Sequence, residues 1–396
     1  MTDTSPDTRP EWDDPSTAAR RAPGARLVAR RQTAIFADGL TLVSGERIAP
    51  LQIAYETFGT LSPKGDNAIL IVHALTGDSH CAGVFDADAR SEKAGWWDPL
   101  IGPGKAFDTN KYFIVCSNNL GGCQGTSGPH SINPATGARY GMRFPIITMR
   151  DIVHAQKKLL EELGIRHLLC VSGGSMGGMN ALEWAAAFPE WTSSIIPVST
   201  SGRLSPQGLA FSFVERQAIM RDPQWHGGDY DPGEPPSHGL AVARMIAHIT
   251  YLSSESMTAK FGRRLKGSAK DPFGDQFEVE SYLNYQGERF VERFDANSYI
   301  YLTKAMDYYD IAEEHATLEE GAARIRCKAL FISFRSDWLF TPRDTAELVE
   351  ALRKVGRDAE YHEIESVYGH DAFLVEYPKY AYLLARFLER IYNYYN

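Results

Sequence analysis

The sequence has no long apolar run, few cysteines and no basic tract. None of its apolar stretches approaches the roughly 20 residues that a helix needs to cross a bilayer, so we expect no membrane partner. The 41 lysines and arginines stand against 50 aspartates and glutamates, a net charge of −9, which argues against nucleic-acid partners. The five cysteines show no metal-ligand spacing, so we expect reduced thiols, a cytoplasmic protein and no metal site.

The N-terminal segment is polar and contains four prolines within its first 30 residues. It lacks the apolar stretch of a secretory signal, and its mixture of acids and bases does not resemble a transit peptide. We predict that residues 1–30 form a mobile tail.

From about residue 68, short apolar runs alternate with longer segments of helical pattern. This alternation predicts an α/β fold whose central sheet is mostly parallel, with helices on both faces. Residues 51–58 are expected to add an antiparallel edge strand. Strands are predicted at residues 68–75, 112–117, 167–172, 194–199, 329–334 and 359–364, and helices at 152–163, 178–188, 345–355 and 378–391.

This alternation stops between about residues 203 and 315. Helical stretches such as GLAVARMIAHITYLSSESM are separated there by patches rich in glycine, proline and aspartate. We predict a helical cap, or lid, at residues 203–315. It would be inserted into a core formed by residues 31–202 and 316–396.

The densest glycine cluster lies in VSGGSMGGMNALEW, residues 171–184. A phosphate-binding P-loop would need a lysine that this segment lacks, and the spacing of a dinucleotide-binding loop is also absent. The match is to G-x-S-x-G, centred on Ser175, between a predicted strand and a predicted helix. That context favours a nucleophile elbow over a glycine turn in which Ser175 only caps the helix.

A serine nucleophile needs a base, and the base needs a third group that orients it. In this architecture the chain order is serine, acid, histidine. Asp337 and His370 each follow a predicted strand in that order. They are the predicted partners of Ser175, with Asp344 and Asp307 as competing acids.

The oxyanion hole should combine the amide after the nucleophile with one from the loop after an early strand. The first donor is the amide of Met176. The second lies in HALTGDSH, residues 73–80, where Leu75 is the preferred donor and Thr76 the alternative. The competing interpretation of this segment is a simple turn at the end of a strand.

Several motifs, taken together, resemble the homoserine O-acyltransferases of the α/β-hydrolase superfamily. They include GGSMGGMNALEW, HALTGDSH, SNNLGGCQGTSGPHSINPATG, FDANSYIYLTKAMDYYD and YGHDAFL, and the match runs from about residue 30 to the C-terminus. The resemblance implies acyl transfer from acyl-CoA to L-homoserine, on the route to methionine, through an acyl-serine intermediate. It also implies a homodimer, and no permanently bound cofactor beside the acyl-CoA co-substrate.

The resemblance also implies how the amino acid is held. Arg244, in the predicted cap, matches the arginine that binds the substrate carboxylate, and Asp371 matches the partner of its ammonium group. Tyr251 lies seven residues after Arg244, on the same face of a helix, and is expected to assist. The competing interpretations are a surface cation for Arg244 and a helix N-cap for Asp371.

The acyl donor is the least determined part of this interpretation. A succinyl group would need a cation near the acyl pocket, and Arg335 stands beside Asp337, where the family more often has threonine. The sequences GGSMGG and GTSGP are more similar to those of the acetyl-type members of the family, so we expect acetyl-CoA and not succinyl-CoA as the donor. A serine esterase or thioesterase, and a non-catalytic interaction protein on the same fold, are the alternatives from other classes.

Overall fold

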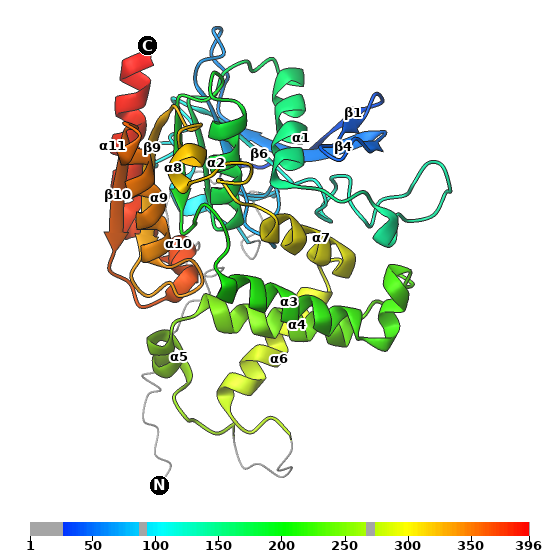
Figure 1. The fold of residues 1–396 in the computed structure, drawn as a ribbon. Helices are drawn as coiled ribbons and strands as arrows, with labels where there is room; N and C mark the ends of the chain where they lie inside the picture. Colours follow the sequence, from blue (N-terminus) through cyan, green and yellow to red (C-terminus); the bar gives the residue numbers. More distant parts are fainter. Residues whose placement is uncertain (1–26, 87–92, 267–273, 396) are drawn as a thin grey trace.

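The computed structural model describes residues 27–86, 93–266 and 274–395. An eight-stranded sheet has the order β1-β4-β6-β5-β7-β8-β9-β10 (Figure 1). The strands from β6 to β10 are parallel, while β1 and β4 pair antiparallel at one edge. The predicted α/β class is therefore confirmed. The strands of this sheet are β1 Gln32–Phe36, β4 Leu51–Phe58, β5 Ala68–Val72, β6 Phe113–Ser117, β7 Cys170–Gly174, β8 Ser194–Val198, β9 Lys328–Phe334 and β10 Ala359–Ile364; β2 Leu40–Thr41 and β3 Arg47–Ile48 form a separate hairpin.

Both faces of the sheet are covered because successive strand residues point to opposite sides. On β5, Leu70 and Val72 belong to one buried cluster, which also contains the apolar residues of α1, α2 and α9. Ile69 and Ile71 belong to a second cluster, together with those of α11. The helices of these layers are α1 Met149–Glu162, α2 Met176–Ala187, α9 Pro342–Lys354 and α11 Tyr377–Tyr395.

The helices α1 and α9 begin three residues earlier than predicted, and the reason lies in their caps. Thr148 and Asp151 form a capping box at the start of α1. Thr341 caps α9, and Pro342 occupies its first turn. Threonine and proline are favoured at these positions because they leave no amide unsatisfied.

Strand β7 also differs from its prediction. It begins at Cys170, not at residue 167, and includes the two glycines before Ser175, which pair with Pro197 and Val198 of β8. Glycine is normally depleted in strands, so the sequence pattern placed the end of this strand at residue 172, two residues before its actual end.

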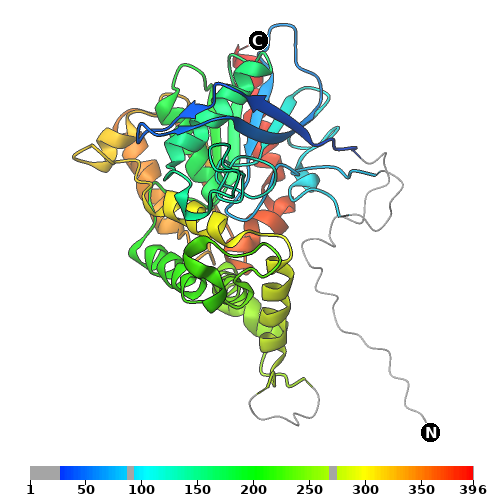
Figure 2. The ribbon, with the colours of Figure 1, turned by 90° about the vertical axis from the view of Figure 1, so that its right-hand side faces the viewer.

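The described part of the segment between β8 and β9 is mostly helical, and Figures 1 and 2 show its helices between residues 206 and 307 gathered at one end of the sheet. The residues of α7 lie in the same buried cluster as the sheet residues, so the inserted helices are continuous with the core. The limits of the cap at residues 203 and 315 stay a prediction. The inserted helices are α3 Pro206–Met220, α4 Ser237–Tyr251, α5 Ser254–Phe261, α6 Glu278–Val291 and α7 Ala296–Asp307, followed by α8 Leu318–Ala322.

The described structure includes the last four residues of the predicted tail. Residues 27–30 were assigned to the tail, but Ala29 is buried and donates its amide to the Val84 carbonyl at 2.8 Å. Val84 in turn donates to the carbonyl of Leu27. This correction moves residues 27–30 into the core, while residues 1–26 lie outside the described part of the chain. None of the described helices has the length and apolar character needed to cross a membrane.

Candidate active site

Ser175 occupies the turn between β7 and α2, with φ 58° and ψ −123°. A positive φ is uncommon for a residue with a side chain and is tolerated where the surroundings enforce it. Here the enforcement is close packing: a Cβ atom at Gly173 or Gly177 would lie 2.4 Å or 2.2 Å from the Val72 carbonyl oxygen. The glycines let α2 approach the sheet closely, and the turn points Ser175 outward beyond the strand.

Asp337 and His370 are joined by a hydrogen bond. Nδ1 of His370 lies 2.7 Å from Oδ2 of Asp337, and both residues are 2% exposed. The other carboxylate oxygen accepts the amides of Leu339 and Phe340, at 3.0 and 2.9 Å. With Nδ1 donating to the carboxylate, Nε2 is left unprotonated and free to act as a base.

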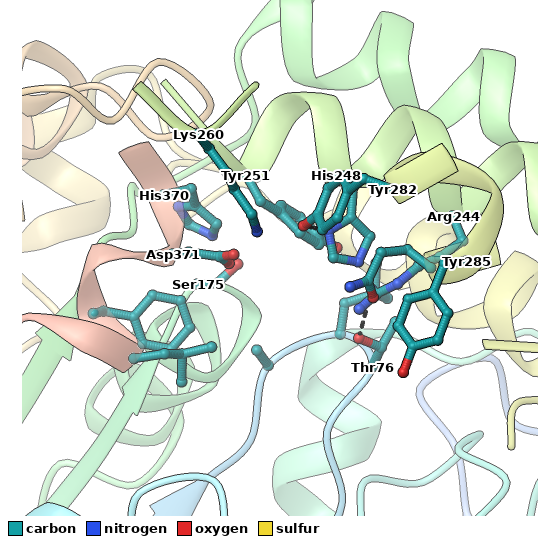
Figure 3. Close-up of a pocket in the computed structure, with 15 residues that line it drawn as sticks. Thr76, Ser175, Arg244, His248, Tyr251, Lys260, Tyr282, Tyr285, His370 and Asp371 are labelled. Carbon is teal, nitrogen blue, oxygen red and sulfur yellow. Dashed lines mark hydrogen bonds between the residues drawn. The ribbon is translucent and has the colours of Figure 1, made fainter. Parts of the chain in front are cut away.

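The two competing acids lie elsewhere. Asp344 accepts a hydrogen bond from Thr341 within the cap of α9, and Asp307 forms an ion pair with Arg216. Ser175 and His370 line one cavity (Figure 3). Among the described residues no hydrogen bond joins them. This contact is often long until substrate is bound, so the geometry fits the predicted roles of Ser175, Asp337 and His370.

The predicted oxyanion donors also lie beside Ser175. Residues 74–77 form a turn closed by the Gly77 amide and the Ala74 carbonyl at 3.0 Å, and Leu75 and Thr76 line the cavity. Among the described residues, no hydrogen bond uses the amide of Leu75. Met176 is the first residue of α2, where an amide has no partner within the helix. Both amides are available to a developing oxyanion.

The cavity has a volume of about 390 Å³, and residues of α4 and α6 form part of its lining. Arg244 and Tyr251 both point into it from α4, and Asp371 faces them from beside His370 (Figure 3). The Arg244 guanidinium carbon lies 5.5 Å from the Tyr251 ring centroid. Burial raises the pKa of the Asp371 carboxyl to about 6, although His370, Arg244 and Lys260 act against this shift. The structure thus places a cation and an acid in the same cavity as Ser175.

Other residues of this cavity were not found from the sequence. His248 lies four residues after Arg244, a spacing that places both on one face of α4 and was available as a signal. Burial lowers the pKa of His248 to about 2, and its Nδ1 lies 3.1 Å from the Tyr282 hydroxyl. Lys260 enters from α5 and packs over the Tyr282 ring, 4.1 Å from its centroid. Nothing in the local pattern around Lys260 indicates this position.

A second, smaller cavity of about 40 Å³ also reaches Ser175 and Leu75. Its walls are mainly apolar and aromatic, and Glu215 of α3 is the one ionisable carboxyl among them. Burial raises the pKa of Glu215 to about 7, and Tyr299 donates a hydrogen bond to it at 2.9 Å. No lysine, arginine or histidine is among the described residues that line this space.

Arg335 does not reach either cavity. Its guanidinium forms ion pairs with Glu363 and Glu365, both at 2.9 Å, and its side chain is 63% exposed. The suggestion that Arg335 serves a succinyl donor is therefore wrong. Glu363 of β10 and Glu365, just after it, pair with the Arg335 guanidinium and keep it at the surface.

Comparison with known proteins agrees with this geometry. Residues 67–377 match the α/β hydrolase fold family. A homoserine O-acetyltransferase from Deferribacter desulfuricans is 53% identical over 360 residues, which are 90% of this chain and 95% of that protein. The chain belongs to the homoserine O-acetyltransferases. The crystal structure of a homoserine O-acetyltransferase from Bacillus anthracis is 34% identical in sequence to this chain. Its TM-score is 0.86, and the match covers 91% of this chain and 98% of that one.

The family fold is also used by hydrolases. The crystal structure of esterase E22 is 30% identical to this chain, with a TM-score of 0.84, over 91% of this chain and all of that one. The fold is therefore shared between an acetyltransferase and an esterase. What separates the two chemistries must be the residues that meet the acyl acceptor.

Proposed function

We propose that this protein transfers an acetyl group from acetyl-CoA to the side-chain hydroxyl of L-homoserine, in the biosynthesis of methionine. The observation that carries the proposal is the pair of opposite charges, Arg244 and Asp371, in the cavity of Ser175. A free amino acid carries a carboxylate and an ammonium group, and each finds its complement there. A hydrolase, whose acceptor is water, has no need of such a pair.

In the first half-reaction the Ser175 oxygen attacks the thioester carbonyl while Nε2 of His370 takes the serine proton. Asp337 holds the imidazole in the required tautomer and stabilises its protonated form. The amides of Leu75 and Met176 donate hydrogen bonds to the carbonyl oxygen and so stabilise the negative charge that develops on it. The carbon–sulfur bond then breaks, and CoA leaves as the thiol with the proton from His370.

In the second half-reaction the homoserine hydroxyl attacks the acetyl-serine. His370 takes the proton of that hydroxyl and then returns a proton to the Ser175 oxygen as the ester bond to the enzyme breaks. Arg244 would hold the homoserine carboxylate through a planar fork of donors, with Tyr251 beside it, and Asp371 would hold the ammonium group. Orientation of the hydroxyl beside the acyl-enzyme favours it over water.

The small cavity beside Ser175 supports an acetyl donor. Its volume of about 40 Å³ is small beside the 390 Å³ of the main cavity, and its mainly apolar walls suit the methyl of an acetyl group. A succinyl group adds a methylene and a carboxylate beyond that methyl. The space offers this carboxylate Glu215 and no cation, so burial of the anion would be uncompensated.

The donor and the acceptor are tested together by CoA release. We expect continued turnover of acetyl-CoA, with steady release of CoA, only when L-homoserine is present, and succinyl-CoA to react at least about 10-fold more slowly because an anion is buried without a partner. Release that is equally fast without homoserine would contradict transfer and favour the esterase or thioesterase alternative. Equal rates for the two donors would contradict the acetyl assignment.

Asp371 predicts how the use of homoserine depends on pH. Its pKa is raised by burial to about 6, so the carboxylate is present above this pH and is lost by protonation below it. A neutral acid cannot pair with an ammonium group, so kcat/KM for homoserine should fall about tenfold per unit below pH 6. The rate of CoA release in the first half-reaction does not involve Asp371 and is the control. Parallel profiles for both half-reactions would contradict this role.

Two further predictions concern the state of the protein. A cytoplasmic location is supported by its five free cysteines, four of which are buried. A homodimer is supported by the resemblance to the family alone. Sedimentation of the purified protein would decide between a monomer and a dimer.

A further inference from the structure

Two arginines from the inserted helices hold one residue of the oxyanion turn. Nη1 of Arg244 donates to the Thr76 hydroxyl at 3.2 Å. Nη1 of Arg293, just beyond the end of α6, donates to the Thr76 carbonyl at 3.0 Å. Thr76 directly follows Leu75, the predicted oxyanion donor, so the turn is fixed from the cap side through both its backbone and a side chain.

The two cations lie close together over one aromatic ring. Their guanidinium carbons are 4.8 Å (Arg244) and 5.1 Å (Arg293) from the centroid of Phe290. In the described part of the chain, neither arginine forms an ion pair with a carboxylate. Burial and the charge of Arg244 both lower the pKa of Arg293. Two like charges so placed repel each other, and the ring face and Thr76 compensate for this in part.

The backbone of Arg293 is anchored to the core as well. Its carbonyl accepts a hydrogen bond from the Gln124 side chain at 2.7 Å, and the Cys123 sulfur accepts the amide of Asp295 at 3.4 Å. Both anchors lie in the loop after β6. Arg293 therefore connects a core loop to the oxyanion turn, and its reach to Thr76 does not depend on the cap alone.

We propose that Arg293 is a positioning residue for acyl transfer: it holds the Thr76 carbonyl so that the Leu75 amide faces the oxyanion, while the Thr76 hydroxyl fixes the guanidinium of Arg244. The second clause rests on the proposed transfer to homoserine, because Arg244 is assigned there to the carboxylate of the acceptor. The first clause concerns every acyl group that reaches Ser175.

The two clauses predict different losses. Without Arg293 the turn loses a charged donor, so the oxyanion is less well stabilised and acylation and deacylation slow together. Without the Thr76 hydroxyl the turn keeps Arg293, and only Arg244 loses its fixed position. KM for homoserine then rises by a larger factor than acylation slows.

The test for Arg293 uses p-nitrophenyl acetate, which acetylates Ser175 without CoA or homoserine. We expect Arg293→Met to slow acetylation by about 10- to 100-fold, the usual cost of losing one hydrogen bond from a charged donor, and Arg293→Lys to recover part of it. Arg289→Met is the matched control: Arg289 lies one turn earlier and pairs with Glu292 on the surface. Acetylation by Arg293→Met within twofold of Arg289→Met would overturn the first clause. The first clause would also be overturned if partial unfolding of Arg293→Met, seen as a lower melting temperature, fully explained its slower acetylation.

The test for Thr76 compares a shape-preserving change with one that keeps the hydroxyl. Thr76→Val should give a KM for homoserine about 10-fold above that of Thr76→Ser, and this difference in KM should exceed the difference between the two variants in acetylation by p-nitrophenyl acetate. Identical KM values for the two variants would overturn the second clause. If wild-type enzyme shows no transfer to homoserine, the proposed function fails, yet the acetylation rates still decide the role of Arg293.

Discussion

Replacement of Ser175 by alanine is expected to lower acetyl transfer by about 10⁵- to 10⁶-fold, the loss typical of a missing serine nucleophile. The alanine leaves the strained turn and the glycine contacts in place but removes the atom that carries the acetyl group. Without the Ser175 hydroxyl, His370 has no group to activate in the first half-reaction, so no acetyl-serine forms. The measurement is the release of CoA from acetyl-CoA in the presence of L-homoserine.

A second serine on the same strand provides the control. Ser172 lies on β7 and donates its buried hydroxyl to the Ile196 carbonyl at 3.0 Å. Ser172→Ala should cost about 1 kcal/mol of stability and leave the specific activity close to that of the wild type. Mass spectrometry should find an acetyl group on Ser175 after brief exposure to acetyl-CoA alone. A Ser175→Ala variant that keeps more than about a tenth of wild-type turnover would contradict the assignment.

The positions of Ser175, Asp337 and His370 could be predicted because each follows a strand. Parallel strands end at one edge of the sheet, so the topology alone places these three residues at that edge. The hydrogen bond between Asp337 and His370 forms across 33 residues of sequence. Predicting this hydrogen bond needed only the order of the strands and the position of each residue just beyond the end of a strand.

The packing of the inserted helices against one another could not be predicted in the same way. Their helical pattern was visible, but the pattern does not state which helix faces which, because many packings bury a similar amount of apolar surface. Lys260, His248 and Glu215 enter the site through such packing, from α5, α4 and α3. The prediction for Arg335 failed for a related reason: Asp337 is only two residues away in the sequence, but the Arg335 guanidinium pairs with Glu363 and Glu365 in space.

The contacts of Thr76 show how the two parts form one site. The sheet supplies the nucleophile, the base and the oxyanion turn, which are common to hydrolases of this fold. The inserted helices supply Arg244 and Arg293, which touch that turn. Under the proposed function, recognition of the acceptor by Arg244 is therefore coupled to the turn that would stabilise the oxyanion, and does not use a separate pocket.

Arg244→Met provides the sharpest separation of the two half-reactions. In the described part of the chain, Arg244 has no carboxylate partner, and its buried Nε atom has no hydrogen-bond partner. A substrate carboxylate would complete this site, and loss of such a desolvated charge pair costs about 2–5 kcal/mol. We therefore expect kcat/KM for homoserine to fall by about 10²- to 10³-fold.

The first half-reaction should be far less affected by this change. Arg293 still holds the Thr76 carbonyl in Arg244→Met, so acetylation of Ser175 should fall by less than about 10-fold. The variant would then accumulate acetyl-enzyme and release CoA in a burst, followed by slow hydrolysis, as an esterase of this fold would. Arg289→Met, on the neighbouring helix, should transfer acetyl groups to homoserine normally. An equal loss in both half-reactions would instead make Arg244 a structural residue, and the acceptor would have to be recognised elsewhere in the cavity.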